Sequence, residues 1–492
     1  MIINFLRIKF FFFLVFLPLR TIFALDVPEP EARPEIKINK FQDVFDQIKK
    51  QNWTMAIVLA EDYNNEYLSS YIKWLDITRP GSNHSFKYLT NFYKEHKHWP
   101  KKEVIIRKVE ESINSKMSSK EIVNWFDQNF PNTSKGKIEY LEAQIKLGLI
   151  SNKQDRIKNI WINSNLNYKQ QRYFIKKYSK YWDQSDNWER FNRLSYEGKN
   201  VSARRVLNRI SGGKRKLGEA RLGLSRRSGN VTQLINNVPV GLKNDPGLIY
   251  ERMRWRRKAK LDSAADLLIS PPKKIENVRN WWINSRIIVR RLLNKKKFNK
   301  AYQILKNHSL PLSSQSGLEA EWMAGWVSYF HLKNYQKLIS HFKNVFNNSD
   351  NNFRSKAAYW LGLANLKIKS DKSIVKKWFQ ESAINKFSFY GQNAALKLDI
   401  FNLDKEKKVS KKPKKFNDLL EVIKIIIASD QRDGKTYPFF KKIFELSSED
   451  NEKLFILEEA YKLENKSIVG KLSKKLKEPS IKYSYPEIVE FI

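Results

Sequence analysis

One stretch of the sequence, KKWFQESAINKFSFYGQNAALKL (376–398), raises a question of chemistry. It contains Glu381 followed by Ser382, so Glu381 is either the acid of an active site or a polar residue on a helix. The histidines His96 and His98 form the other close pair of reactive side chains. No third ligand stands near them in the sequence, so we expect a solvent-facing pair at a helix end rather than a metal site.

Other familiar chemical motifs are missing from the chain. It contains no cysteine, which excludes disulfides, thiolate metal sites and cysteine nucleophiles. It also contains no G-x-G-x-x-G element, no phosphate-cradling loop ending in Lys-Ser/Thr and no H-E-x-x-H element. We therefore predict no catalytic, cofactor-binding or metal-binding residue and no cofactor.

Helical periodicity runs through nearly all of the chain after residue 40. Two units, 321–346 and 358–383, repeat at an offset of 37 residues, so that Gly325 aligns with Gly362 and Phe342 with Phe379. A glycine at this position lets the facing helix approach closely. Because one helix pair cannot bury its apolar faces alone, we predict an all-α fold: a right-handed superhelical array (a solenoid or horseshoe) of short, tetratricopeptide-like helix pairs.

Composition divides the chain into four parts. Residues 1–24 combine a positive start with a short apolar run, which predicts a signal peptide. An uncleaved N-terminal anchor is the alternative, but a membrane span needs about 20 apolar residues. Residues 25–401 form the predicted α-superhelical repeat domain, and 402–416 a Lys-rich linker or loop. Residues 417–492 are predicted as C-terminal helices that complete the superhelix.

The formal net charge is +41. Such an excess of basic residues is typical of proteins with an anionic partner. The basic residues are spread over the whole chain, however, so a compositional bias explains the charge equally well. An exported protein meets little nucleic acid, which favours anionic cell-wall polymer or lipid headgroups as the partner.

Three segments resemble the soluble lytic murein transglycosylases: DPGLIYERMRWRR (245–257), EAEWMAGW (319–326) and FYGQNAALKL (389–398). The likeness runs from about residue 40 to the end of the chain. It implies a periplasmic protein with a long superhelix, followed in the family by a lysozyme-like domain. Such enzymes cleave the MurNAc–GlcNAc bond of peptidoglycan without water, and one Glu with a raised pKa acts as acid and then as base.

The chain departs from the family's catalytic motif. Ala383 and Ile384 follow Glu381-Ser382 where the family has an aromatic residue, and no Gly-Leu-Met-Gln element occurs in the sequence. We therefore expect Glu381 to be structural. The final segment, YSYPEIVEFI, is similar to the point where the lysozyme-like domain begins. We expect that the catalytic domain is missing from this chain and that the chain alone is inactive.

These observations predict a periplasmic, lytic transglycosylase-like scaffold that takes part in peptidoglycan turnover. Its expected partners are glycan strands and, in addition, a separate catalytic domain or periplasmic proteins. We expect neither nucleic acid nor a transmembrane segment after signal cleavage. The alternatives are a periplasmic tetratricopeptide-like interaction module without cell-wall activity, and an inactive fragment from a truncated reading frame.

Overall fold

The computed structural model describes residues 40–386, 388–400, 416–429, 435–463, 466–473, 475–476 and 483. The predicted signal peptide and residues 402–415 of the predicted linker lie outside this range. The described residues form helices and short turns, with no strand among them. None of the described helices is both long enough and apolar enough to cross a membrane.

Seven helices make up the first part of the chain: α1 (Gln42–Lys49), α2 (Trp53–Asp62), α3 (Glu66–Thr78), α4 (Phe86–Glu95), α5 (Lys102–Ser112), α6 (Ser119–Gln128) and α7 (Ser134–Lys146). The middle part contains α8 (Lys153–Asn163), α9 (Tyr168–Tyr178), α10 (Gln184–Tyr196), α11 (Asn200–Leu207), α12 (Gly212–Arg226), α13 (Val231–Asn236) and α14 (Pro246–Lys258).

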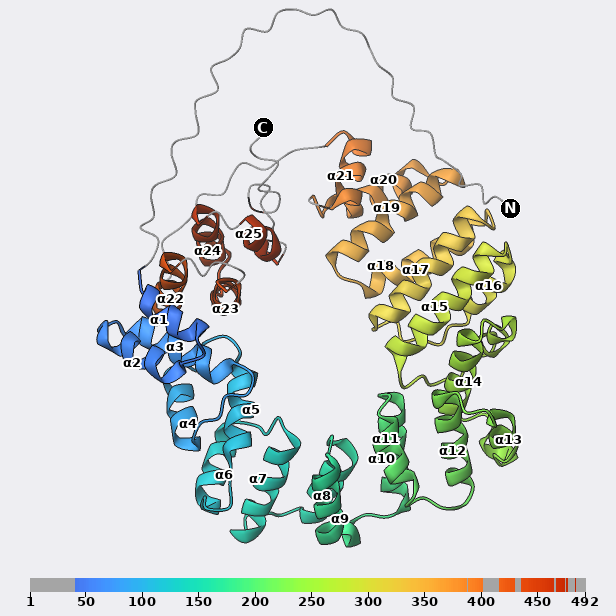
Figure 1. Ribbon diagram of the computed structural model, residues 1–492. Helices are drawn as coiled ribbons and strands as arrows, with labels where there is room; N and C mark the ends of the chain where they lie inside the picture. Colours follow the sequence, from blue (N-terminus) through green and yellow to red (C-terminus); the bar gives the residue numbers. More distant parts are fainter. Residues whose placement is uncertain are drawn as a thin grey trace, which may run out of the picture.

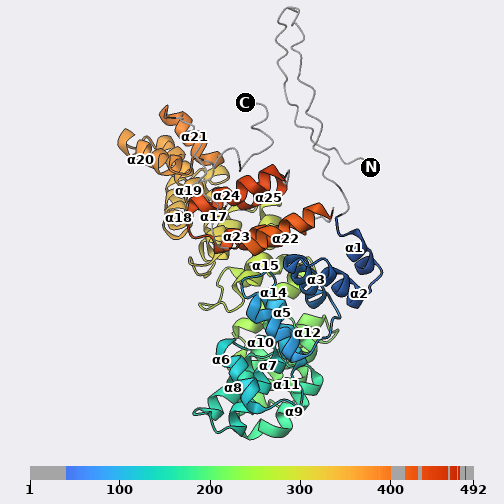
Figure 2. The same cartoon turned by 90° about the vertical axis from the view of Figure 1, so that its left-hand side faces the viewer.

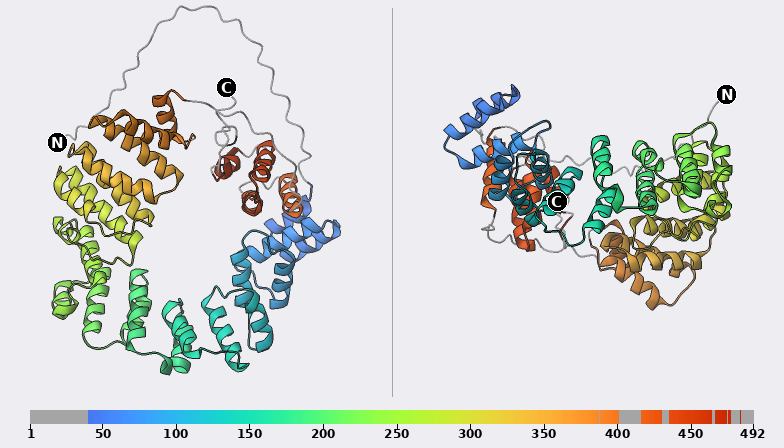
Figure 3. Two further views of the ribbon diagram at one scale, coloured as in Figure 1. Left: turned by 180° about the vertical axis from the view of Figure 1, so that it is seen from behind. Right: turned by 90° about the horizontal axis from the view of Figure 1, so that it is seen from below.

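The repeat stack follows: α15 (Val278–Asn294), α16 (Phe298–Lys306), α17 (Gln315–Phe330), α18 (Tyr335–Asn348), α19 (Asn351–Lys367), α20 (Lys372–Ala383) and α21 (Phe389–Leu398). The last described helices are α22 (Asn417–Ala428), α23 (Tyr437–Leu446), α24 (Asp450–Lys462) and α25 (Lys466–Ser473). Helices α1 to α21 follow one another around most of a ring (Figure 1), and the view from behind shows the same order (Figure 3). The predicted all-α superhelical array of helix pairs is confirmed.

Glycines allow the helices of the repeat stack to pack closely. A methyl group added at Gly325 would lie 2.3 Å from Phe342, and one added at Gly362 would lie 2.8 Å from Phe379. Real side chains do not approach this closely, so each glycine opens the space that the phenylalanine of the next helix fills. The predicted role of the Gly–Phe pairs is confirmed.

The first and last described helices share one hydrophobic core, whose members come from 41–143 and 419–483. The ring of Phe439 on α23 lies 4.9 Å from Trp74 on α3 and 5.7 Å from Trp99 (centroid distances). Helix α22 packs on α3 on the side of the molecule that faces the viewer in Figure 2. Helices α22 to α25 therefore pack against the first helices of the chain.

The histidine pair takes part in this contact. It lies at the end of α4, as predicted, but both rings are half-buried rather than facing solvent. The Nε2 atom of His98 lies 2.7 Å from Oδ2 of Asp418 on α22, and the indole Nε1 of Trp99 donates to the same oxygen at 2.7 Å. His96 packs against Phe92 and Trp99, with ring centroids 4.5 Å away in both cases, and burial lowers its pKa. The sequence could not place Asp418 beside His98, because 320 positions separate them.

Candidate binding groove

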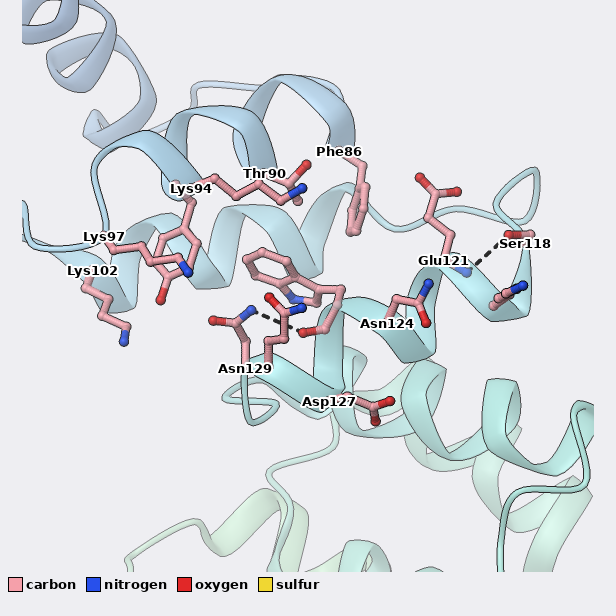
Figure 4. A pocket seen from close by; sticks show the side chains of 14 residues that line it. Phe86, Thr90, Lys94, Lys97, Lys102, Ser118, Glu121, Asn124, Asp127 and Asn129 are labelled. Atoms are coloured by element: carbon pink, nitrogen blue, oxygen red, sulfur yellow. Dashed lines mark hydrogen bonds between the residues drawn. The ribbon is translucent and has the colours of Figure 1, made fainter.

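A groove of about 810 Å³ lies between α4, α5 and α6 (Figure 4). Aromatic, basic, acidic and amide side chains line it together: Phe86, Thr90, Tyr93, Lys94, Lys97, Lys102, Ser118, Lys120, Glu121, Asn124, Trp125, Asp127, Gln128 and Asn129. Binding sites in proteins commonly combine such an aromatic surface with a few polar groups that fix the ligand's orientation.

Helical spacing brings these side chains to one side of their helices. Phe86, Thr90 and Lys94 are each separated by one turn of α4, and residues one turn apart share a helix face. On α6, Glu121 and Asn124 are three residues apart and therefore also lie beside one another, across the groove from α4 (Figure 4). The two helices therefore supply opposite walls.

Both helices begin at a serine cap. The Ser85 hydroxyl accepts a hydrogen bond from the backbone N–H of Tyr88 at 3.3 Å, and the Ser118 hydroxyl accepts one from that of Glu121 at 3.2 Å. A serine in this position satisfies a backbone donor that the first helical turn leaves free. These caps fix where the walls of the groove begin.

The aromatic floor of the groove is built around Trp125. Its ring packs edge-to-face against Phe86 at 6.0 Å and against Tyr93 at 5.4 Å. The side chain is only 7% exposed, and its indole Nε1 has no hydrogen-bond partner within the described structure. A buried donor without a partner costs free energy, and the packing of the ring against Phe86 and Tyr93 has to offset that cost.

The charge of the groove is positive. Four lysines line it (Lys94, Lys97, Lys102 and Lys120), and within the described residues none of them forms a salt bridge. Two carboxylates face them; that of Asp127 accepts a hydrogen bond from the Tyr140 hydroxyl at 2.9 Å. The groove thus offers ammonium groups for anions, amides for hydroxyl groups and the half-buried ring of Phe86 for apolar surfaces.

Glu381 and Ser382, which raised the question of an acid, lie on α20 away from this groove. The Glu381 carboxylate is 3.6 Å from the guanidinium of Arg354 on α19, and its side chain is 30% exposed. Ser382 is fully buried; its hydroxyl donates to the Ser355 carbonyl at 2.9 Å, and the Ser355 hydroxyl donates back to the Ser382 carbonyl at 2.9 Å. The pair joins α19 to α20, which agrees with a structural role.

A second cluster has the residue types of a catalytic site. Within it, Nδ1 of His341 lies 2.7 Å from Glu321 and Nε2 lies 3.1 Å from the Tyr302 hydroxyl, while His308 lies 3.1 Å from the other Glu321 oxygen. Burial alone would raise the pKa of Glu321, but hydrogen bonds with His308 and His341 outweigh it and lower the pKa to about 2. A general acid needs a raised pKa, so this buried cluster connects α16, α17 and α18 instead.

The sequence analysis missed the groove. The sequence feature that could have indicated the groove is the segment FKYLTNFYKEHKHWPKK (86–102), in which aromatic residues and lysines alternate. Such alternation also occurs on ordinary amphipathic helices, so only the packing of α4 against α6 shows which rings line open space. Within the described residues, no three His, Cys, Asp or Glu side chains are placed to hold a metal ion.

The ring of helix pairs places the chain among superhelical helix-repeat proteins. No protein-family model matches its sequence, and no curated protein matches it. Among solved structures, the 70-kDa soluble lytic transglycosylase in complex with bulgecin A aligns with a TM-score of 0.58 at 14% identity, over 88% of this chain and 70% of its own.

Two further structures align equally well. The 70-kDa soluble lytic transglycosylase from Escherichia coli has a TM-score of 0.58 at 13% identity, over 88% of this chain and 69% of its own. An inactive variant of the lytic transglycosylase Slt from Pseudomonas aeruginosa has a TM-score of 0.57 at 13% identity, over 91% of this chain and 72% of its own. The fold is therefore the one seen in soluble lytic transglycosylases.

Proposed function

We propose that this chain is the superhelical scaffold of a lytic transglycosylase-type protein and binds the glycan strands of peptidoglycan. The observation that carries the proposal is the fold, which these enzymes share over most of this chain. The segments 245–257, 319–326 and 389–398, which resemble the same family, support it independently. A curved array of helix pairs suits an extended polymer, because its binding surface is extended too.

The groove at α4–α6 is the binding site in this proposal. Peptidoglycan presents sugar rings, hydroxyl and acetamido groups, and the carboxylates of its peptide stems. The half-buried ring of Phe86 can support a sugar ring, and the amides of Asn124 and Asn129 can hydrogen-bond to its substituents. The unpaired lysines would attract the carboxylates of the stems.

Bond cleavage is assigned to a separate lysozyme-like domain. Glu381 is tied to Arg354 on the packed face between α19 and α20, and the low pKa of Glu321 makes it an ionised hydrogen-bond acceptor rather than a proton donor. Export to the periplasm, after removal of residues 1–24, completes the proposal. N-terminal sequencing of the mature protein checks that step.

One observation favours the alternative, a tetratricopeptide-like module that binds proteins. Large apolar side chains are exposed near the end of the repeat stack: Ile384 is 73% exposed, Phe389 is 71% exposed and Leu396 is 64% exposed. Phe389 and Leu396 are seven residues apart on α21 and therefore share a helix face, and exposed apolar faces are typical of protein contact surfaces. This face would serve a partner protein whether or not the groove binds glycan.

Co-sedimentation with purified peptidoglycan sacculi tests the proposed function. We expect the folded chain to sediment with sacculi at low salt and to be released as salt rises, since screening weakens the attraction of lysines to carboxylates. Analysis of the soluble fraction should show no anhydro-muropeptides. Lack of retention at low salt would contradict glycan binding, and release of anhydro-muropeptides that a Glu381→Gln variant abolishes would contradict the assignment of Glu381.

A further inference from the structure

A second, smaller cavity of about 240 Å³ lies between α12, α13 and α14, which are neighbours in the ring (Figure 1). One wall is basic and aromatic, one is apolar, and the rim is polar; the lining residues are Leu224, Val231, Thr232, Ile235, Asn236, Arg252, Trp255 and Arg256. The cavity does not share a residue with the groove at α4–α6.

Its basic wall is an arginine pair on α14. Arg252 and Arg256 are one helical turn apart and therefore lie on the same face. Neither forms a salt bridge with any carboxylate in the described part of the chain, whereas their neighbour Arg254 pairs with Glu251 at 3.0 Å. Arg256 donates one hydrogen bond to the Ser263 carbonyl at 3.1 Å, which fixes its guanidinium beside the cavity.

The pair carries positive charge that the protein does not neutralise. Burial and the charge of Arg256 both lower the pKa of Arg252. Two like charges at this spacing repel each other, and half-burial increases the cost of each. An anion in the cavity would remove that cost, and a guanidinium binds a carboxylate or phosphate through two parallel hydrogen bonds.

The other walls indicate what the anion is attached to. Leu224, Val231 and Ile235 form an apolar surface opposite the arginines, and Thr232 and Asn236 provide polar groups at the exposed rim. A bare phosphate would leave the apolar wall without a partner. A carboxylate next to a small apolar side chain and a peptide amide uses all three kinds of surface.

We propose that this cavity binds the C-terminal carboxylate of a short peptide whose last side chain is small and apolar. Arg252 and Arg256 hold the carboxylate, the apolar wall receives the last side chain, and Thr232 or Asn236 hydrogen-bonds to the preceding amide. The inference goes beyond the proposed glycan binding and does not depend on it, because the cavity and its residues are separate.

A matched pair of peptides tests it on the unmodified chain. Isothermal titration with acetyl-Ala-Ala bearing a free carboxylate should show saturable binding, and the same peptide with a C-terminal amide should bind about 10-fold more weakly or worse. Equal affinity for the two peptides, or no binding of the free carboxylate, would overturn the proposal. Inorganic phosphate that binds more tightly than the free-carboxylate peptide would also overturn it.

Variants locate the site. Arg252→Gln should weaken binding of the free-carboxylate peptide about 10-fold or more, since it removes a charge-assisted hydrogen bond. Arg279→Gln, at an exposed position outside the cavity lining, makes the same change in charge and should leave the affinity within about 2-fold. Equal losses in the two variants would overturn the assignment.

Should Arg252→Gln unfold, as circular dichroism would show, Arg256→Gln takes its place. None of these titrations involves sacculi, so their failure leaves the glycan-binding test unaffected.

Discussion

Helices α17–α20 of the repeat stack and the groove at α4–α6 are both rich in aromatic rings, but the rings have different surroundings. In the stack, Phe342 is 1% exposed, lies over Gly325 and stacks on Trp322 with the two ring planes 6° apart. In the groove, Phe86 and Tyr93 pack edge-to-face on Trp125 beside an open volume of about 810 Å³.

Trp125 and Tyr93 are 7% and 4% exposed, so these two rings serve stability as Phe342 does in the stack. The groove differs because the half-buried Phe86 and several lysines border its open volume. The stack resembles lytic transglycosylases most clearly in sequence, yet the polar groups described there are engaged in holding helices together. The groove lies within the span of the likeness but contains none of the three most similar segments, and it exposes lysines that form no salt bridge within the described residues.

Truncation of one ring in each region should separate the two roles most strongly. Phe342→Ala should lower the free energy of unfolding by about 3–5 kcal/mol, because it leaves a cavity in a closely packed layer. The measurement is urea denaturation followed by circular dichroism. Phe86→Ala, at a half-buried position, should cost about 1 kcal/mol or less. Similar losses in both variants would mean that the groove's rings are as structural as those of the stack.

The carboxylates of the two regions should respond differently to acid. Glu321 has a folded-state pKa of about 2 against an ordinary value of 4.5, so its stabilising effect is complete above pH 4.5 and is lost as pH falls towards 2. Glu321→Gln should lower stability at neutral pH by about 1.5–3 kcal/mol, with the difference from the parent shrinking in acid.

Glu121 is the matched control in the groove, since its side chain is exposed. Glu121→Gln should change the free energy of unfolding by no more than about 0.5 kcal/mol at any pH where the chain folds. Denaturation curves collected across the acid range make the comparison. A Glu321→Gln variant whose deficit stays constant in acid would show that its carboxylate does not stabilise the stack by ionisation.

The smallest effect concerns the glycines. Gly325→Ala should destabilise the chain by about 1–2 kcal/mol, because the added methyl would lie 2.3 Å from Phe342, although alanine favours the helix. Gly229→Ala, where nothing lies within 4 Å, should change stability by about 0.5 kcal/mol or less. Thermal melts of the two variants make the comparison, and equal melting temperatures would refute close packing at Gly325.

The parts of this structure that could be predicted depend on residues close in sequence. The Gly–Phe pairs follow from one helix meeting the next, and α21 begins at a local cap, since the Ser388 hydroxyl accepts a hydrogen bond from the Gly391 N–H at 2.9 Å. Local side-chain chemistry determines both. The role of His98 was predicted incorrectly because its partner, Asp418, comes from the far end of the chain.

The groove could not be predicted for a related reason. Its floor requires Trp125 of α6 to meet Phe86 and Tyr93 of α4, and each of these rings alone has the spacing of an ordinary core residue. Which face of a helix remains uncovered depends on how successive pairs turn around the ring. The periodicity of apolar residues does not specify the angle between successive helix pairs.

The central claim is that the groove at α4–α6 holds glycan strands, and sedimentation with sacculi tests it most directly. The variant to measure carries Lys94→Gln, Lys97→Gln and Lys120→Gln, which removes three unpaired cations of the groove. Its retention at low salt should fall by about 10-fold, in keeping with the loss of several charge-assisted contacts.

The matched control carries Lys343→Gln, Lys367→Gln and Lys372→Gln, at exposed positions of the repeat stack. It loses the same charge from a total of +41, so any attraction due to net charge alone changes equally in both variants. The fraction of this control that sediments with sacculi should stay within about 2-fold of that of the unmodified chain. Equal loss of retention in the two variants would contradict a glycan site in the groove.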